Sequence, residues 1–264
     1  MKDPQERIQK WLAARGLGSR REIEGWIRDG RLRVNGKPAE LGQKITGHER
    51  LSLDGRPLRV SPDKDPPRKI LMYHKPVGEI CTRKDPEGRK SVFHSLPRLR
   101  QGRWVSIGRL DLNTAGLLLF TNDGNLANLL MHPSAEIERE YWVRVAGDVS
   151  EETLDMLRRG VELEDGFAKF DDIQPLHALH DDDEQYNRYF SVVLKEGRNR
   201  EVRRLWEAAG CQVSRLKRTR FGNINLPKEL AAGRYRELSV AESNALLSLI
   251  RKKPRPEKKP PAPR

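Results

Sequence analysis

The sequence predicts an α+β fold in two parts: a small helix–helix–β-hairpin domain, then a larger domain with a mixed, mainly antiparallel sheet. Two observations predict this class. The first sixty or so residues show two short helical patterns of apolar residues, followed by alternating apolar residues and turn sequences. Beyond them, strand and helix patterns interleave without the regular βαβ rhythm of a doubly wound sheet. The length of 264 residues allows two modest domains.

The first domain is expected over residues 4–62. Ile8, Trp11 and Leu12 have the spacing of one buried helix face. Ser19 then opens a capping box with the glutamate three residues later, which predicts the start of a second helix. A β-hairpin is predicted where apolar residues alternate ahead of Asn-Gly and Asp-Gly turns, at Leu32, Val34, Leu51 and Leu53.

The second domain is expected over residues 70–250, after a proline-rich and charged linker at 63–69. Apolar runs predict strands at Ile70–Tyr73, Gly116–Thr121, Tyr141–Val145 and Phe190–Leu194. Helical spacing and end signals predict helices from Leu126, after Ser150, over Asn199–Ala209 and over Ala241–Ile250. The last segment, 251–264, holds five prolines and seven basic residues and is predicted to be a disordered tail.

The charge is unevenly placed along the chain. Lys and Arg total 51 against 38 Asp and Glu, a net charge of +13. Residues 1–62 and 251–264 each carry a net +6, while the body between them carries +1. Such basic ends indicate a polyanionic partner, a nucleic acid above all, with solubility as the alternative reason. The longest apolar run is only Leu117–Phe120, which excludes a membrane span, and two cysteines exclude a disulfide framework or a structural zinc site.

Asp111 is the first candidate for chemistry. It lies in a polar loop immediately before a very apolar strand, so the core would fix its backbone at a strand edge. Arg109, two residues earlier, offers a charge partner that would keep the carboxylate ionised. The alternative for Asp111 is a turn-forming aspartate, an interpretation that suits Asp123 in Asn-Asp-Gly better.

A second candidate segment is strongly basic. Residues 188–220 hold ten basic and three acidic side chains. Gly197 is expected between a strand and a helix, where backbone N–H groups can meet a phosphate. A solvated basic helix is the alternative, but Val202 and Leu205 predict one buried face.

The run GSRREIEGWIRDGRLRVNG, residues 18–36, resembles the S4 RNA-binding domain. This resemblance implies a basic helix face that contacts structured RNA. The residues expected on that face are Ser19, Arg20, Arg21, Arg28, Arg31 and Arg33.

The body resembles the pseudouridine synthases, in the branch that acts on ribosomal RNA and carries an S4 domain. The matching motifs are Lys-Pro-x-Gly at 75–78 and Gly-Arg-Leu-Asp-x-x-Thr-x-Gly-Leu-Leu at 108–118. The resemblance implies that a uridine is isomerised without a cofactor, with Asp111 as nucleophile, Tyr141 stacking on the base and Arg203 pairing with the aspartate. Further substrate contacts are expected from Arg109, Asn113, Thr114, Lys75, Leu216 and Arg200.

Segments 81–97 and 196–206 favour those members of the branch that act on large-subunit 23S ribosomal RNA, in its peptidyl-transferase domain. A member acting on small-subunit 16S RNA is the alternative within the family. A non-catalytic S4-type RNA-binding or ribosome assembly factor is the alternative outside it, and it would need no Asp111, Tyr141 or Arg203. A DNA-binding protein has no groove-reading motif to support it. We expect a cytoplasmic monomer with no membrane partner and no metal, although residues 177–183 (HALHDDD) offer a weak alternative metal site.

Overall fold

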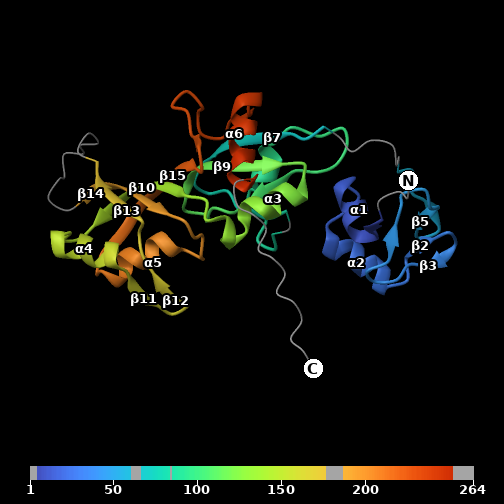
Figure 1. Cartoon of the computed structure of the whole chain (residues 1–264), viewed down its shortest axis with the longest axis horizontal. Helices are drawn as coiled ribbons and strands as arrows, with labels where there is room; N and C mark the ends of the chain where they lie inside the picture. The colour runs from blue at the N-terminus through green and yellow to red at the C-terminus, as the bar shows by residue number, and fades with distance from the viewer. Residues whose placement is uncertain (1–4, 61–66, 84, 177–186, 252–264) are drawn as a thin grey trace. The chain divides into compact units, whose positions relative to one another are not determined.

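The computed structural model describes residues 5–60, 67–83, 85–176 and 187–251 (Figure 1). Most of the expected linker, the tail after residue 251 and the 177–183 segment lie outside these ranges. The chain divides into two compact units. The first comprises Met1–Lys69, Pro97–Val105 and Thr121–Gly124, and the second comprises Ile70–Leu96, Ser106–Phe120 and Asn125–Arg264.

The first unit contains the two predicted helices, α1 (Ile8–Ala14) and α2 (Arg20–Arg28). The Ser19 hydroxyl accepts a hydrogen bond from the Glu22 N–H at 3.1 Å, and the Glu22 carboxylate accepts one from the Ser19 N–H at 3.3 Å, which confirms the capping box. The predicted hairpin is larger than expected. The Asn-Gly and Asp-Gly turns each lead into a further two-residue strand, so the sheet has four strands in the order β3 (Lys37–Pro38), β2 (Leu32–Val34), β5 (Leu51–Leu53) and β6 (Arg56–Pro57).

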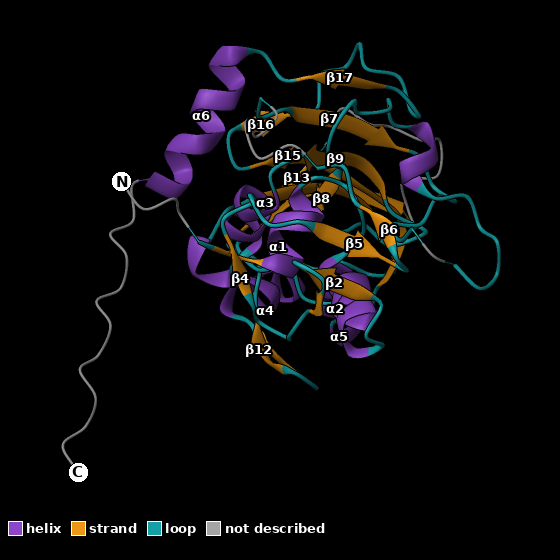
Figure 2. Cartoon of the chain, turned by 90° about the vertical axis from the view of Figure 1, so that its right-hand side faces the viewer, coloured by secondary structure: helices purple, strands orange, loops and turns teal. Residues whose placement is uncertain are grey.

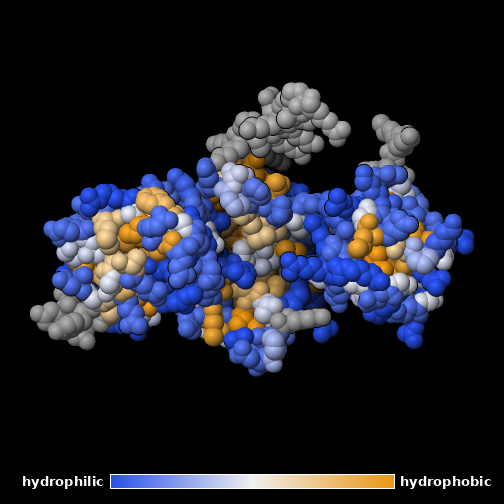
Figure 3. Space-filling model, turned by 90° about the horizontal axis from the view of Figure 1, so that it is seen from below, coloured by the Kyte–Doolittle hydropathy of each residue, from blue (hydrophilic) through white to orange (hydrophobic). Residues whose placement is uncertain are grey.

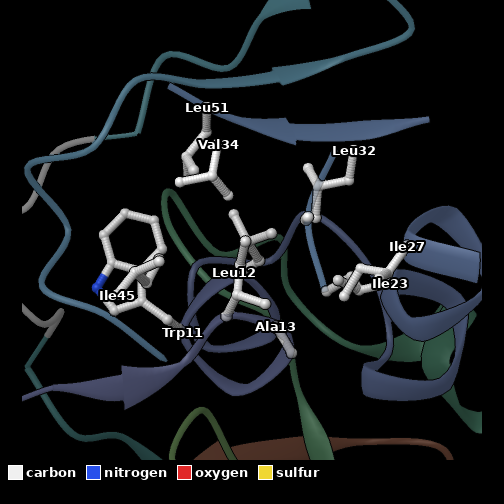
Figure 4. Packing of buried hydrophobic residues seen from close by; sticks show 11 residues of the cluster. Trp11, Leu12, Ala13, Ile23, Ile27, Leu32, Val34, Ile45 and Leu51 are labelled. Atoms are coloured by element: carbon white, nitrogen blue, oxygen red, sulfur yellow. The ribbon is translucent and has the colours of Figure 1, made fainter. Parts of the chain in front are cut away.

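The core of this unit lies between the helices and the sheet (Figure 4). Ile8 and Leu12 of α1 and Ile23 of α2 are fully buried. They pack with the inward residues of β2 and β5 (Figure 4). Trp11 lies beside Ile45 of β4 (Lys44–Ile45), which pairs with β1 (Glu6–Arg7). The apolar spacing in the sequence is therefore the face that builds this core.

The second unit is built on a nine-stranded sheet. Its main path runs β13 (Asp172–Pro175), β14 (Asn187–Leu194), β10 (Arg139–Ala146), β15 (Gln212–Phe221), β9 (Ala115–Thr121), β7 (Ile70–Lys75) and β17 (Tyr235–Glu237), with β8 (Val105–Ile107) on β9 and β16 (Ile224–Asn225) on β15 (Figures 1 and 2). β10 pairs antiparallel with β14 and β15, and so do β13 with β14, β16 with β15 and β17 with β7, whereas the short pairing between β15 and β9 is parallel. The predicted α+β class with a mixed, mainly antiparallel sheet is confirmed.

Four helices accompany the sheet: α3 (Gly124–Met131), α4 (Glu151–Arg159), α5 (Glu201–Ala208) and α6 (Val240–Arg251). They confirm the four helices predicted for this domain. Short 3₁₀ helices lie at Val92–Ser95 and Pro133–Ala135. Trp206 of α5 is fully buried and lies 5.2 Å from the ring of Phe190 on β14, which fixes α5 against the sheet. A separate hairpin, β11 (Val161–Leu163) and β12 (Gly166–Ala168), lies next to α5 (Figure 1).

Gly116 lets β9 and β15 approach closely. Its φ is +110°, a conformation that L side chains rarely adopt, and an added Cβ would collide with the backbone of Arg218, the nitrogen of which would be only 2.6 Å away. We therefore expect Gly116→Ala to lower the free energy of unfolding by about 3 kcal/mol or more, because strain and overpacking add.

The measurement is chemical denaturation of the full chain. Gly124→Ala is the matched control, because nothing lies within 4 Å of an added Cβ at the start of α3, and it should stay within about 0.5 kcal/mol of the parent. If Gly116→Ala were as stable as the parent, β9 and β15 could move apart at Gly116 with little loss of stability.

The surface drawn in Figure 3 is mostly hydrophilic, and its hydrophobic residues form separate patches. This agrees with the charged residues, which make up 34% of the sequence. Within the described ranges, no helix combines the length and the hydropathy that a membrane span requires.

Candidate active site

The candidate active site is a pocket in the second unit. It has a volume of about 850 Å³, within the range of roughly 300–1,000 Å³ that is typical of ligand sites. Six of the nine residues that the family resemblance assigns to the site line it, from four separate parts of the chain: Asp111, Tyr141, Arg109, Thr114, Arg200 and Leu216. Lys75, Asn113 and Arg203 are not among its lining residues.

Asp111 lies in the loop between β8 and β9. The loop is a tight turn, in which the Thr114 N–H donates to the Asp111 carbonyl at 3.0 Å. The Gly78 N–H holds the next residue by donating to the Leu112 carbonyl at 2.9 Å. The strand that follows is buried from Gly116 to Thr121, so the loop is attached to a strand that the core holds in place. The sequence argument for a fixed carboxylate at a strand edge agrees with this geometry.

The Asp111 carboxylate itself forms no hydrogen bond or ion pair within the described part of the chain. Arg109 lines the same pocket and also lacks a side-chain partner there, so the ion pair expected between these two residues is not formed. An unpaired carboxylate keeps its lone pairs available for a ligand, which a nucleophile or a base requires. A structural turn aspartate would instead cap its own backbone with that carboxylate.

Lys75 binds the backbone of this loop. Its side chain is fully buried at the end of β7, and its ammonium donates to the carbonyl oxygens of Thr114 at 2.8 Å and of Asp111 at 3.0 Å. It also donates to the Pro76 carbonyl at 3.0 Å and lies 3.5 Å from the Leu112 carbonyl. Burial lowers the pKa of Lys75 below its ordinary value.

The expectation that Lys75 contacts the substrate needs correction. All the donors of its ammonium are used by backbone carbonyls, and the side chain has no exposed surface. The lysine therefore positions the loop that carries Asp111.

Arg203 holds the same loop from another direction. From α5, its guanidinium donates to the Val213 carbonyl at 2.7 Å and to the Asn113 carbonyl at 3.0 Å. Burial lowers the pKa of Arg203, and the nearby negative charge of Asp111 opposes that shift. The side chain of Asn113 is exposed, while its carbonyl serves Arg203. The expected contact ion pair between Arg203 and Asp111 is absent from the described residues; the two charges interact at longer range.

Tyr141 comes from β10, in the middle of the sheet. Its register partners are Val192 on β14 and Arg218 on β15. The residue is 8% exposed and lines the pocket, and its hydroxyl has no hydrogen bond within the described ranges. A flat ring with a free hydroxyl on a rigid strand is suited to receive a planar base.

Arg218 lines the pocket and was not predicted. It is 2% exposed, its Nε donates to the Leu117 carbonyl at 2.7 Å, and its Nη2 has no partner. No carboxylate pairs with it among the described residues. A buried guanidinium without a counter-ion is costly for a purely structural residue, which makes Arg218 a further candidate residue of the site.

Arg139 is a second residue that sequence reasoning missed. It lines the pocket and donates to the carbonyl oxygens of Ile137 at 2.8 Å and of Lys195 at 2.6 Å. Burial lowers its pKa. In the sequence, only its place in the charged run 138–140 points to Arg139 as a site residue. Its role is to join the start of β10 to the loop at 195–200, which forms another part of the pocket wall.

No group of three or more His, Cys, Asp or Glu side chains suited to a metal ion occurs in the described residues. Cys81 is partly buried, and its thiol donates to the Leu110 carbonyl at 3.2 Å, next to Asp111. Cys211 is 3% exposed.

The chain resembles known proteins along most of its length. Residues 69–208 match the model described as RNA pseudouridylate synthase, and residues 6–51 match the S4 domain. A solved structure titled "Crystal structure of pseudouridylate synthase" is similar, with a TM-score of 0.62 and 26% identity, over 91% of this chain and 99% of that one.

Several relatives are named "Ribosomal large subunit pseudouridine synthase B". The one from Pseudomonas aeruginosa is 53% identical over 94% of this chain and 64% of its own length. The one from Vibrio cholerae is 52% identical over 96% of this chain and 77% of its own length. The one from Salmonella typhimurium is 53% identical over 93% of this chain and 83% of its own length. The chain thus spans a little less than two thirds of the first relative. With these matches, the chain belongs to the RNA pseudouridylate synthase family and includes an S4 domain.

Proposed function

We propose that this protein converts a specific uridine of large-subunit (23S) ribosomal RNA into pseudouridine, with Asp111 as nucleophile and without a cofactor. The observation that carries the proposal is the unpaired Asp111 carboxylate, fixed by its backbone in a pocket that Tyr141 also lines. The names of relatives that are 52–53% identical support the choice of RNA. We further propose that it works as a monomer in the cytoplasm.

The reaction breaks the bond between ribose C1′ and uracil N1, forms one between C1′ and C5, and moves a proton from C5 to N1. Nothing is oxidised and no group is donated, so the chain needs only to bind, hold and move a proton. Asp111 is placed to act at the junction between ribose and base. Tyr141 is suited to stack on the uracil, and Arg218 supplies positive charge in the pocket wall. A base in folded RNA must leave its stack to enter such a pocket.

The direct test is to map pseudouridines in ribosomal RNA from cells that lack this protein. We expect a large-subunit site to revert to uridine, to be restored by the wild-type chain, and to stay unmodified with Asp111→Asn. Loss of a site in small-subunit RNA alone would contradict the proposed target. An unchanged map would contradict the activity itself and favour a binding or assembly role.

The basic face of the S4 domain yields a further prediction. Arg20 and Arg21 at the start of α2 are exposed, and their side chains have no acidic partner in the described residues. Replacing both by Gln should weaken RNA binding and reduce the slope of log affinity against log salt by about two, roughly one for each phosphate that is no longer neutralised. Salt titration of RNA affinity measures this.

Arg31 provides the matched control. Its guanidinium already pairs with Asp54, with Nε–Oδ1 at 2.8 Å and Nη2–Oδ2 at 2.6 Å, and this pair raises the pKa of Arg31. Arg31→Gln should therefore change the salt slope less than the loss of either free arginine. If the slope of log affinity against log salt is the same for the wild type and the double variant, Arg20 and Arg21 of α2 do not contact RNA phosphates.

A further inference from the structure

Phe167 is an exposed aromatic residue at the pocket. It lies on β12 of the separate β11–β12 hairpin, 54% exposed, and it is one of the residues that line the pocket. Tyr141, which lines the same pocket from the central sheet, is only 8% exposed. The two rings therefore differ in depth: Tyr141 is inside the pocket and Phe167 is at its rim.

The Phe167 ring has a defined position although it is exposed. It lies against Gly160, the residue that ends α4 with φ +105°, where an added Cβ would come within 2.8 Å of the ring atom Cε1 and closer still to Cζ. Only a residue without a side chain leaves room for the ring there. The far end of the ring, at Cζ, thus lies against the Gly160 backbone while the residue stays half open to solvent.

The backbone under Phe167 is fixed as well. Arg198, from the opposite segment of the pocket wall, donates to the Phe167 carbonyl at 2.8 Å and to the Gly166 carbonyl at 3.0 Å. Arg204 of α5 holds the turn of the hairpin through a bidentate pair with Asp165, at 2.7 and 2.9 Å. Bidentate pairs of this kind fix orientation. The hairpin is therefore tied to α5 and to the loop at 195–200.

One unpaired cation lies close to Phe167 in the chain. Lys169 follows two residues later, is exposed, lines the same pocket and has no acidic partner among the described residues. Phe167 is opposite Glu162 in the hairpin register, so the neighbouring strand offers no apolar cover for the ring. A rigid aromatic ring beside a free ammonium is suited to an unpaired nucleobase and its phosphate.

We propose that Phe167 is a stacking platform for an unpaired nucleobase that neighbours the target uridine in the RNA, with Lys169 on the adjoining phosphate. This inference rests on the proposed function, and it adds how the same site holds the RNA outside the reacting nucleotide. The target base goes to the buried ring of Tyr141, and a neighbouring base, which stays outside the pocket, covers the exposed ring.

The experiment uses the full chain and a ribosomal RNA stem-loop that carries the target uridine. Phe167→Ala should lower kcat/KM by roughly 5- to 100-fold, mainly through KM, because base–aromatic stacking is removed. Phe167→Tyr should keep most of the activity, and Phe167→Leu should behave like Ala. Tyr235→Ala is the control, since this aromatic residue is 42% exposed on β17 and does not line the pocket; it should match wild type.

Abasic RNAs identify the stacked base. Removing the base at one position beside the target should lower kcat/KM of the wild type by the same factor as Phe167→Ala does on intact RNA. The same abasic RNA should not lower kcat/KM of the Phe167→Ala variant any further. 2-Aminopurine at that position should be quenched by the wild-type chain and not by Phe167→Ala. Both results together support the platform.

Four results would count against the platform or its basis. If the wild type is active and Phe167→Ala is equally active, Phe167 does not stack on a base. Full activity of Phe167→Leu would lead to the same conclusion. Either result would leave the proposed function intact. A defect seen only on ribosomal precursors that contain protein, and never on naked RNA, would mean that Phe167 contacts a protein. A wild-type chain that forms no pseudouridine in any ribosomal RNA would overturn the proposed function and this inference with it.

Discussion

Asp111→Asn should lower the rate of pseudouridine formation by at least roughly 10⁴-fold, because the amide keeps the shape of the side chain but removes the nucleophilic charge. The folded state should be nearly unaffected, since the carboxylate forms no ion pair or hydrogen bond in the described structure that the substitution would break. RNA affinity should also persist, because the basic surfaces are unchanged. Single-turnover kinetics and RNA affinity, measured on the same preparation, test both halves.

Asp155→Asn is the matched control for this change. Asp155 lies on α4 and pairs with Arg158 at 3.0 Å, and the pair is largely exposed and of little energetic weight. This variant should retain full activity. Substantial turnover by Asp111→Asn would mean that another group attacks the substrate.

Lys75→Met should have the second-largest effect. It removes a buried ammonium and leaves the carbonyl oxygens of Thr114 and Pro76 without this donor, while the Asp111 carbonyl keeps the hydrogen bond from the Thr114 N–H. Each buried acceptor left unsatisfied costs roughly 1–3 kcal/mol, so the free energy of unfolding should fall by about 3 kcal/mol or more. Activity should fall by roughly 100-fold even below the unfolding transition, because a loop displaced by about an ångström misplaces Asp111.

Denaturation and single-turnover rates separate these two effects. The exposed Lys228, replaced by Met, is the control and should change neither. If Lys75→Met were destabilised yet fully active at low temperature, the lysine would support the fold without positioning the Asp111 loop.

The sequence predicted the helices and most of the long strands because each has one clear apolar pattern. β15 escaped prediction although it has ten residues and lies at the centre of the sheet. Two register shifts against β10 break its alternation, and Arg218 occupies an interior position where an apolar residue is expected. The two-residue strands β3 and β6 were missed because they are too short to show any period.

The sequence predicted most of the residues of the site but fewer of their contacts. The motif around Asp111 indicated the carboxylate, but the hydrogen-bond partners of a buried cation cannot be predicted from the spacing of residues in the sequence. Lys75 and Arg203 are 36 and 90 residues away from the carbonyl groups of the Asp111 loop that accept their hydrogen bonds. Only the tertiary fold decides that both hold backbone oxygens. The orphan nitrogen of Arg218 and the packing of Phe167 on Gly160 have no sequence signal at all.

The position of β15 has a consequence for how the chain acquires activity during synthesis. Asp111 follows β8 and precedes β9, Tyr141 lies on β10, and within the sheet only β15 joins these two strands. A growing chain that has not yet released residues 212–221 therefore holds two separate half-sheets and no assembled pocket. Non-local strand pairing of this kind is slow, so the pocket should be a late product of folding. The S4 domain, whose match ends at residue 51, would leave the ribosome well before the strand that completes the pocket.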